Sequence, residues 1–389
     1  MTKQEKKKMH SEITFYQESN WKAVKQFIHQ NWRANHPICQ KELFDWQHKG
    51  FGYKKGEVSP LLLLSDGEIV GFRGVIPGLY QIPTKKGQMK IVKGGSAPLW
   101  LVKKEFRGMP AIRMYEKILQ LFPVTTASGI NVNTAMKFHK KHGFKVLNGL
   151  HRYILPLNTE GYQKLLFKRV ELDEIREWMT RGFRSSAEVS PSTKPDAKKI
   201  AELWEKVSFP DKIFSLYRNS EFWEWRYINS KGFNYLFFGD PEVDGIIVAR
   251  IEKVISKNFE RLDGDKIFRI IEFIPGFGFS ENMHKDKETL NLLTGVLQWA
   301  TNCGCLMADF QCSSKRFEKI LDLAGFRDQN QFLNKPIFSI PTLFQPLKYD
   351  AAPINAAFRV GLHDDFISKI NWNDTYLVKS ESDQDRPNI

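Results

Sequence analysis

The sequence predicts an α/β (α+β) fold in which one unit occurs twice in tandem. Two observations lead to this prediction. Runs of apolar and β-branched residues alternate with amphipathic helical segments along most of the chain, as in mixed twisted sheets flanked by helices. A set of landmarks then recurs at a nearly constant spacing of about 180 residues, which indicates an internal repeat. The 389 residues also exceed the length of one typical domain, so we expect two domains.

Three pairs of landmarks define the repeat. They are Trp46 and Trp225 in aromatic segments, Asp66-Gly67 and Asp244-Gly245 between apolar runs, and Gly143-Phe144 and Gly325-Phe326 after amphipathic helices. An Asp-Gly pair between two apolar runs indicates a β-hairpin, because both residues accept the backbone angles of a tight turn. Each unit is therefore expected to begin with helices, continue through a hairpin, and end with a helix and a strand.

The spacing of apolar residues assigns the elements in order. In the first unit we expect helices at 21–29 and 41–46, a hairpin of strands 61–64 and 68–75, a strand at 90–102, a helix at 112–122, a strand at 124–128, a helix at 133–142 and a strand at 151–155. In the second unit we expect helices at 197–207 and 221–227, strands at 235–238, 246–251 and 267–274, a helix at 289–301, a strand at 306–311, a helix at 315–324 and a strand at 336–340.

Composition divides the chain into five segments. We expect a disordered basic tail over 1–12, an N-terminal unit over 13–157, a connecting helix and linker over 158–190, a C-terminal unit over 191–347 and an extension over 348–389. The connecting helix is expected at 162–179, and the Ser- and Pro-rich stretch after it is typical of a linker. The polar end of the extension is expected to be loosely ordered.

The net charge of +14 and the pI of about 9.4 favour an anionic partner. No recognition helix, zinc finger or RNA-binding motif is present, so we do not expect nucleic acid, whereas peripheral binding to an acidic membrane stays open. No apolar run approaches the roughly 18 residues of a membrane span, and the charged N-terminus is not a secretory signal. Four cysteines are too few for a disulfide framework, and no residue set has metal-ligand spacing. We therefore expect a cytoplasmic protein without a metal.

The segment from Pro98 to Phe122 is the most informative part of the chain. An apolar strand runs into a short basic loop with Arg107 and Gly108, and an amphipathic helix follows. Such a turn binds anions, because unpaired N–H groups and the positive end of the helix face the same space. We expect it to hold a phosphorylated cofactor. The alternative is a core helix that begins at a proline and holds no ligand.

These features together resemble the GNAT superfamily of N-acetyltransferases. The matching residues are Val102 to Gly108 at the strand end and loop, and Asn133 to Ala135 with His142 to Phe144 in the later motif. The two-unit layout, the aromatic run 222–226 and the end 383–387 are similar to acetyltransferases of bacterial surface-polysaccharide gene clusters. The resemblance implies acetyl-CoA as the acyl donor, held by Val102, Arg107, Gly108, Met109, Ala111, Ile112 and Asn133.

The loop departs from the superfamily at two positions. Pro110 and Ile112 stand where the superfamily has glycines. Proline has no N–H to donate, and the branched Ile112 side chain crowds the place where backbone approaches a phosphate. After strand 267–274 the second unit has a Gly-Phe-Gly-Phe run that is more typical of a turn. We therefore expect one donor site, in the N-terminal unit, and a second unit that shapes the acceptor pocket.

Two residues are candidates for proton transfer. The resemblance places His139 where the superfamily often has the tyrosine that protonates the leaving thiolate, and histidine donates protons near neutral pH. The alternative for His139 is a surface position without a role. Leu321 occupies the matching position of the second unit. Because leucine cannot donate a proton, we expect the second unit to be catalytically inactive. Glu272, in an apolar strand, is the candidate general base, and its alternative is an ion pair with Arg269 or Arg250.

The resemblance implies a tandem N-acetyltransferase that acetylates a small primary amine, with a nucleotide- or lipid-linked amino sugar as the acceptor class. Two alternatives stay open. One is a non-catalytic binding or scaffold protein that keeps the fold, and the other is a tandem transferase of the cell-wall type that uses aminoacyl-tRNA. Binding of acetyl-CoA tests the first alternative, and salt-sensitive tRNA binding tests the second.

Overall fold

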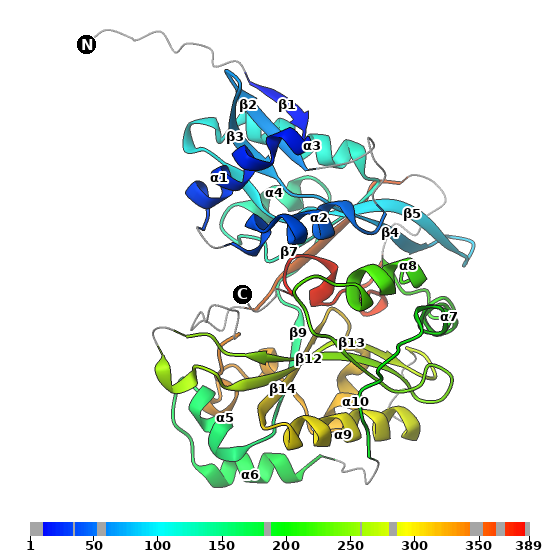
Figure 1. The fold of residues 1–389 in the computed structure, drawn as a ribbon. Helices are drawn as coiled ribbons and strands as arrows, with labels where there is room; N and C mark the ends of the chain where they lie inside the picture. Colours follow the sequence, from blue (N-terminus) through cyan, green and yellow to red (C-terminus); the bar gives the residue numbers. More distant parts are fainter. Residues whose placement is uncertain are drawn as a thin grey trace.

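The computed structural model describes residues 11–33, 36–52, 60–182, 188–256, 259–279, 286–342, 353–362 and 370–385. These residues form two α/β units, and the C-terminal segment lies between them (Figure 1). Mixed sheets flanked by helices confirm the expected fold class. Most of the expected basic tail lies outside the described residues, although Glu12 already belongs to the first strand, β1. No helix in the described ranges is long and apolar enough to cross a membrane.

The N-terminal unit contains two sheets. The smaller has the order β1 (Glu12–Phe15), β2 (Leu61–Ser65), β3 (Glu68–Arg73) and β6 (Trp100–Val102). The larger has the order β10 (Ser215–Leu216), β4 (Ile76–Pro83), β5 (Met89–Ser96), β7 (Val124–Ser128), β16 (Ala356–Val360) and β8 (Lys145–Leu147). Helices α1 (Trp21–Asn31), α2 (Lys41–Lys49), α3 (Met109–Leu121) and α4 (Ala135–Lys141) complete the unit.

The C-terminal unit has one six-stranded sheet. Its order is β11 (Leu236–Phe238), β12 (Gly245–Lys253), β13 (Lys266–Pro275), β14 (Cys305–Cys312), β9 (His151–Pro156) and β15 (Arg327–Asp328). Its helices are α5 (Thr159–Leu165), α6 (Leu172–Thr180), α7 (Ala197–Ser208), α8 (Ser220–Trp223), α9 (Lys287–Asn302) and α10 (Glu318–Leu323), and a π-helical turn, Glu224–Ile228, follows α8.

The two units exchange strands. The expected last strand of the first unit, at 151–155, is β9, and it pairs with β14 and β15 in the sheet of the second unit. Strand β16, from the extension, takes the corresponding place in the first unit, between β7 and β8. Assigning 151–155 to the first sheet was therefore wrong. Alternating apolar residues predict a strand but carry no information about its partner, which is decided by the path of the chain.

Three other elements differ from the sequence prediction. The single strand expected at 90–102 is divided into β5 and β6, because Pro98 has no N–H to donate and Leu99 has a positive φ of 46°. The strand expected at 336–340 is a 3₁₀ turn that begins at Pro336. The single connecting helix expected at 162–179 is the pair α5 and α6.

Packing of α3 positions the candidate anion loop. The helix buries Ala111, Met114 and Ile118 in one apolar cluster with Leu61 and Leu63 of β2. These three residues recur at helical spacing, so one face of α3 lies on the sheet and the other faces solvent. The helix consequently begins next to the end of β6, as the strand–loop–helix pattern predicts.

Candidate functional site

In the N-terminal unit, the strand that leads to the anion loop separates from its neighbour. Strands β5 and β7 pair in parallel only from Gly94 to Ser96, and the Ala97 N–H still donates to the Thr126 carbonyl at 3.1 Å. Beyond this point β6 pairs with β3, while Ala127 and the residue after it pair with β16. The glycines near the end of β5 thus lie just before the point where β6 diverges from β7. Glycines at such a point allow a ligand to approach the backbone closely.

The loop after β6 leads directly into the N-terminus of α3. Gly108 is the N-cap, and a Cβ added to it would meet no atom within 4 Å. The exposed Arg107 folds back, since its Nε donates to the Val102 carbonyl at 3.1 Å. The Ile112 N–H donates to the Gly108 carbonyl at 3.0 Å. This N–H is therefore not available to a ligand, although the sequence prediction included Ile112 among the donor-binding residues. The N–H groups of Met109 and Ala111 precede this first helical hydrogen bond and remain as donors.

The structure places His139 inside the unit rather than on its surface. It is 3% exposed, and its ring packs edge-on against Tyr115 and Phe144. Its Nδ1 donates to the Ala135 carbonyl at 2.7 Å, and burial lowers its pKa to about 4. A neutral ring that donates through Nδ1 has no proton on Nε2, so this geometry does not support an acid. Asn133, in contrast, is exposed, and its N–H donates to Oδ1 of Asn131 at 3.0 Å.

Glu272 is fully buried and surrounded by hydrogen-bond donors. Its carboxylate accepts from Tyr227 at 2.5 Å, from Ser380 at 3.0 Å, and from two nitrogens of Arg218 at 3.2 and 3.3 Å. Glu272 therefore forms its ion pair with Arg218. The alternative expected from the sequence, an ion pair with Arg269 or Arg250, named the wrong partner. Both carboxylate oxygens of Glu272 thus accept hydrogen bonds within the protein, and Glu272 anchors the C-terminal segment through Ser380.

The C-terminal segment fills the second unit at the place where its central strands separate. Strands β13 and β14 pair only as far as Ile270 and Phe310. Beyond this point the Tyr376 hydroxyl accepts from the Phe273 N–H at 2.9 Å, and Val378 forms a β-bridge with Cys312. The expectation of a loosely ordered end was therefore wrong for residues 380–385, the described part of that stretch. The chain's own residues occupy this part of the second unit.

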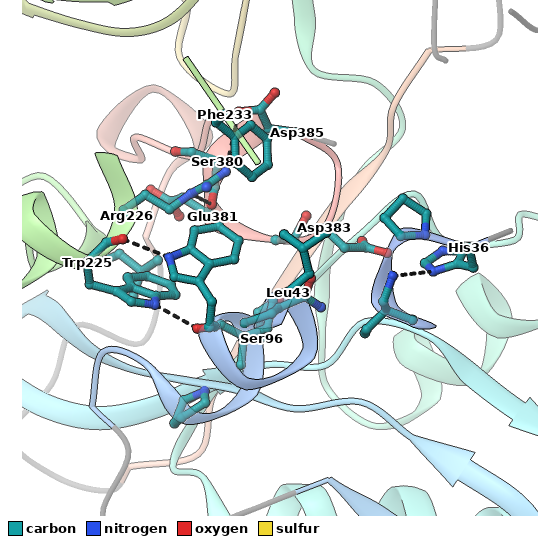
Figure 2. A pocket seen from close by; sticks show the side chains of 18 of the residues that line it. His36, Leu43, Ser96, Trp225, Arg226, Phe233, Ser380, Glu381, Asp383 and Asp385 are labelled. Atoms are coloured by element: carbon teal, nitrogen blue, oxygen red, sulfur yellow. Dashed lines mark hydrogen bonds and ion pairs between the residues drawn. The ribbon is translucent and has the colours of Figure 1, made fainter. Parts of the chain in front are cut away.

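The same segment continues into a pocket between the two units. Residues lining the pocket come from the N-terminal unit (His36, Leu43, Trp46, Gln47, Ser96 and neighbours), from the π-helical turn and β11 region (Trp225, Arg226, Phe233) and from the C-terminal segment (Ser380, Glu381, Ser382, Asp383, Asp385). Figure 2 shows the C-terminal residues on one side of the pocket, with Ser96 and Leu43 on the side of the N-terminal unit. Because Ser96 is the last residue of β5, the pocket reaches the point where β6 leaves β7.

Several residues that line this pocket carry a buried polar atom with no hydrogen-bond partner in the described structure. Among these atoms are Oε2 of Glu381, Oγ of Ser96, Nε2 of Gln47 and Nη1 of Arg226. Buried polar groups are nearly always paired, so this gathering of unpaired acceptors and donors indicates a ligand site. Glu381 accepts from Nη2 of Arg218 at 2.6 Å through its other oxygen, and burial raises its pKa to about 8 against the opposing charge of Arg218.

Aromatic side chains form a wall of the same pocket. Trp46 and Trp225 stack with their centroids 5.4 Å apart, and Phe233 lies 5.5 Å from Trp46. Behind them Asp385 accepts from Arg250 at 3.0 Å and from Tyr235 at 2.5 Å, which fixes the end of the described chain. The pocket thus combines aromatic faces with unpaired hydrogen-bonding groups.

Comparison with solved structures finds similar folds at low sequence identity. Saccharomyces cerevisiae N-myristoyltransferase with bound myristoyl-CoA gives a TM-score of 0.54 at 14% identity, over 90% of this chain and 79% of that one. A GCN5-related N-acetyltransferase from Anabaena variabilis gives 0.52 at 10% identity, over 91% and 73%. The fold is the GNAT fold, present twice. No protein-family model matches the sequence, and no curated protein does.

Within this tandem GNAT fold, sequence reasoning missed the residues that face the pocket. Glu381 and Asp383 lie in a polar run that resembles a loose tail, and no periodicity marks either residue. The one available signal was the presence of arginines in otherwise apolar segments of the second unit, such as Arg250. Buried arginines need carboxylate partners, and the acidic end of the chain supplies them.

Proposed function

We propose that this protein is an N-acyltransferase that moves an acetyl group from acetyl-CoA to a primary amine. The pocket carries this proposal, because it places a buried carboxylate with an unpaired oxygen, Glu381, where β6 leaves β7 beside Ser96. The similarity to the fold of yeast N-myristoyltransferase, whose solved structure holds myristoyl-CoA, supports an acyl-CoA donor.

The donor's diphosphate would bind at the start of α3. The residues fit this group, since Gly108 leaves open space, Met109 and Ala111 offer N–H groups, and Arg107 adds a positive charge on an exposed loop. Val102, at the end of β6, and Asn133, before α4, remain further proposed donor-binding residues. The acyl-CoA supplies an activated thioester carbonyl, and the chain's residues bind and orient it.

Glu381 is the proposed general base. The attacking amine must lose a proton as its nitrogen bonds to the thioester carbonyl carbon and the carbon–sulfur bond breaks. Oε2 of Glu381 has no other partner, and its pKa of about 8 matches a base that works slightly above neutral pH. This assignment replaces Glu272, whose oxygens are already used.

We further propose an amino sugar as the acceptor. The aromatic side chains of Trp46, Trp225 and Phe233 line the pocket, and aromatic walls of this kind suit contact with the apolar side of a sugar ring. The pocket also offers unpaired donors, Nη1 of Arg226 and Nε2 of Gln47, for ring hydroxyls. The sequence resemblance supports a role in surface-polysaccharide biosynthesis, and the cysteine content supports a cytoplasmic location; both are part of this proposal.

Calorimetric titration with acetyl-CoA tests the donor, with Arg107→Ala as the matched variant. We expect binding by the wild-type protein and weaker binding by Arg107→Ala. A wild-type protein that does not bind acetyl-CoA overturns the proposal and favours a non-catalytic scaffold. A thiol-release assay with glucosamine, a nucleotide-linked amino sugar and a simple alkylamine then tests the acceptor, and we expect turnover with the sugars above that with the alkylamine.

A further inference from the structure

One buried arginine differs from all the others. Six arginines in the described residues are buried, and five form ion pairs: Arg152 with Asp309, Arg218 with Glu272 and Glu381, Arg226 with Asp385, Arg250 with Glu252 and Asp385, and Arg269 with Glu252 and Asp309. Arg73 is 4% exposed and forms no ion pair with any described residue. A buried charge without a direct ion pair is costly, so its presence needs a reason.

Arg73 lies at the divergence of β6 from β7. It ends β3, and its Cα pairs with that of Trp100, the first residue of β6. Its guanidinium lies over the Trp100 ring, 5.2 Å from the centroid, and the Tyr115 ring of α3 stacks on the same Trp100 ring with the two centroids 5.3 Å apart. Burial lowers the pKa of Arg73 to about 10, and the nearby Tyr115 and Asp383 oppose this shift.

Three hydrogen-bond donors on these side chains are buried without a partner in the described structure. They are Nε of Arg73, Nε1 of Trp100 and the Tyr115 hydroxyl. An indole N–H and a guanidinium N–H only donate, and a phenol donates readily. Three unpaired donors beside one unpaired positive charge are complementary to an anion.

We propose that the Arg73–Trp100–Tyr115 cluster binds the negative charge that forms on the sulfur of the departing thiolate. This inference rests on the proposed N-acyltransferase activity. When the amine nitrogen bonds to the carbonyl carbon, the carbon–sulfur bond breaks, its electron pair stays on sulfur, and the amine proton goes to Glu381. The sulfur leaves as a thiolate, and a fixed positive charge with donors lowers the energy of that charge as it develops.

The neighbouring histidine makes this role necessary. His139 lies 5.2 Å from the Tyr115 ring, but its Nε2 has no proton, so it does not protonate the leaving group. Within the described residues around Tyr115, Arg73 is the buried group that is charged at neutral pH. The cluster therefore stabilises the leaving thiolate by its positive charge, whereas the sequence prediction had His139 protonate that thiolate.

The first test is the thermal stability of the protein without any ligand, compared between Arg73→Met and Arg269→Met. Removal of an uncompensated buried charge should leave the Tm unchanged or raise it by roughly 2–5 °C, whereas loss of the paired Arg269 should lower it. A fall in Tm for Arg73→Met as large as that for Arg269→Met means that Arg73 has a structural counter-ion, and it overturns the inference.

The second test is the pKa of the thiol of free coenzyme A bound to the protein, followed by thiolate absorbance as pH is raised. We expect the wild-type protein to lower this pKa by at least about one unit from a thiol's ordinary 8.5, Arg73→Lys to retain part of the shift, and Arg73→Met to abolish it. Equal thiol pKa values in wild type and Arg73→Met overturn the inference. Steady-state kinetics with acetyl-CoA and an amine give a third readout. The kcat of Arg73→Met should fall about 100-fold or more below that of the wild-type protein, with a small change in KM.

The binding and thiol-pKa experiments distinguish failure of the proposed acyltransferase function from failure of the proposed role of Arg73. If the wild-type protein binds no coenzyme A, the proposed function fails, and the inference fails with it whatever the Tm values are. If coenzyme A binds and its thiol pKa is unaffected by Arg73→Met, the acyltransferase proposal stands and the role of Arg73 does not.

Discussion

Trp46 and Trp225 each donate the indole N–H to the other's backbone carbonyl, at 2.8 and 2.7 Å. The two residues occupy equivalent places in the two units, and their rings stack at the boundary between them. A reciprocal contact of this kind is what a two-fold relationship between equal surfaces produces. Equivalent residues of the two repeats therefore contact each other at the wall of the pocket, which Figure 2 shows from close by.

Loss of either indole N–H should weaken the contact between the units. In Trp46→Phe or Trp225→Phe, one hydrogen bond is removed and a half-buried carbonyl loses its donor, so we expect about 1–3 kcal/mol lower stability. The double variant should lose less than the sum, because the second substitution acts on a contact that is already broken. Urea denaturation of the four proteins measures this coupling, and strict additivity would contradict it.

Replacement of Glu381 should change both the rate and its pH dependence. A general base works only when it is deprotonated, so kcat/KM should rise with pH and reach half its maximum near pH 8. In Glu381→Gln we expect kcat to fall by about 10²–10⁴ and the rise near pH 8 to disappear. The exposed Glu224→Gln is the control, and it should keep the wild-type profile. A Glu381→Gln profile that still rises near pH 8 would assign the base elsewhere.

Restoring the missing donor in the anion loop should tighten binding of the acyl donor. Pro110 stands in the first turn of α3, where it has no N–H to offer. In Pro110→Ala the new N–H points with those of Met109 and Ala111, so the Kd for acetyl-CoA should fall several-fold. Pro336→Ala, in the first turn of a helix in the second unit, is the control without effect. An unchanged Kd for Pro110→Ala would place the diphosphate away from this loop.

Two buried histidines should make the protein less stable in mild acid. Burial lowers the pKa of His48 and of His139 to about 4, below the ordinary 6.5. Each group is therefore neutral in the folded state, and its contribution to stability is present above pH 6.5 and lost as pH falls toward 4. For the fully buried His48 this amounts to roughly 3 kcal/mol. Denaturation at pH 7.5 and pH 5 should show the loss, and His48→Gln should reduce it.

The sequence predicted the geometry around the candidate site only where that geometry is local. The loop of Arg107 and Gly108 follows a strand and opens a helix, and neighbouring residues define all three parts. The burial of His139 and the surroundings of Glu272 depend on segments far away in the chain, such as Arg218 and Ser380. The sequence therefore predicted the strand, loop and helix around Arg107, whereas the burial of His139 and the partners of Glu272 could not be read from it.

What the sequence determined by itself is the repeat, because period and turn residues are properties of neighbouring positions. It also determined the alternation of helices and strands that makes each unit α/β. What only the tertiary structure decided is the exchange of β9 and β16 and the placement of the C-terminal segment. These depend on pairing across long chain separations, where buried arginines require the acids of the last residues. The pocket exists because that segment reaches back between the two units.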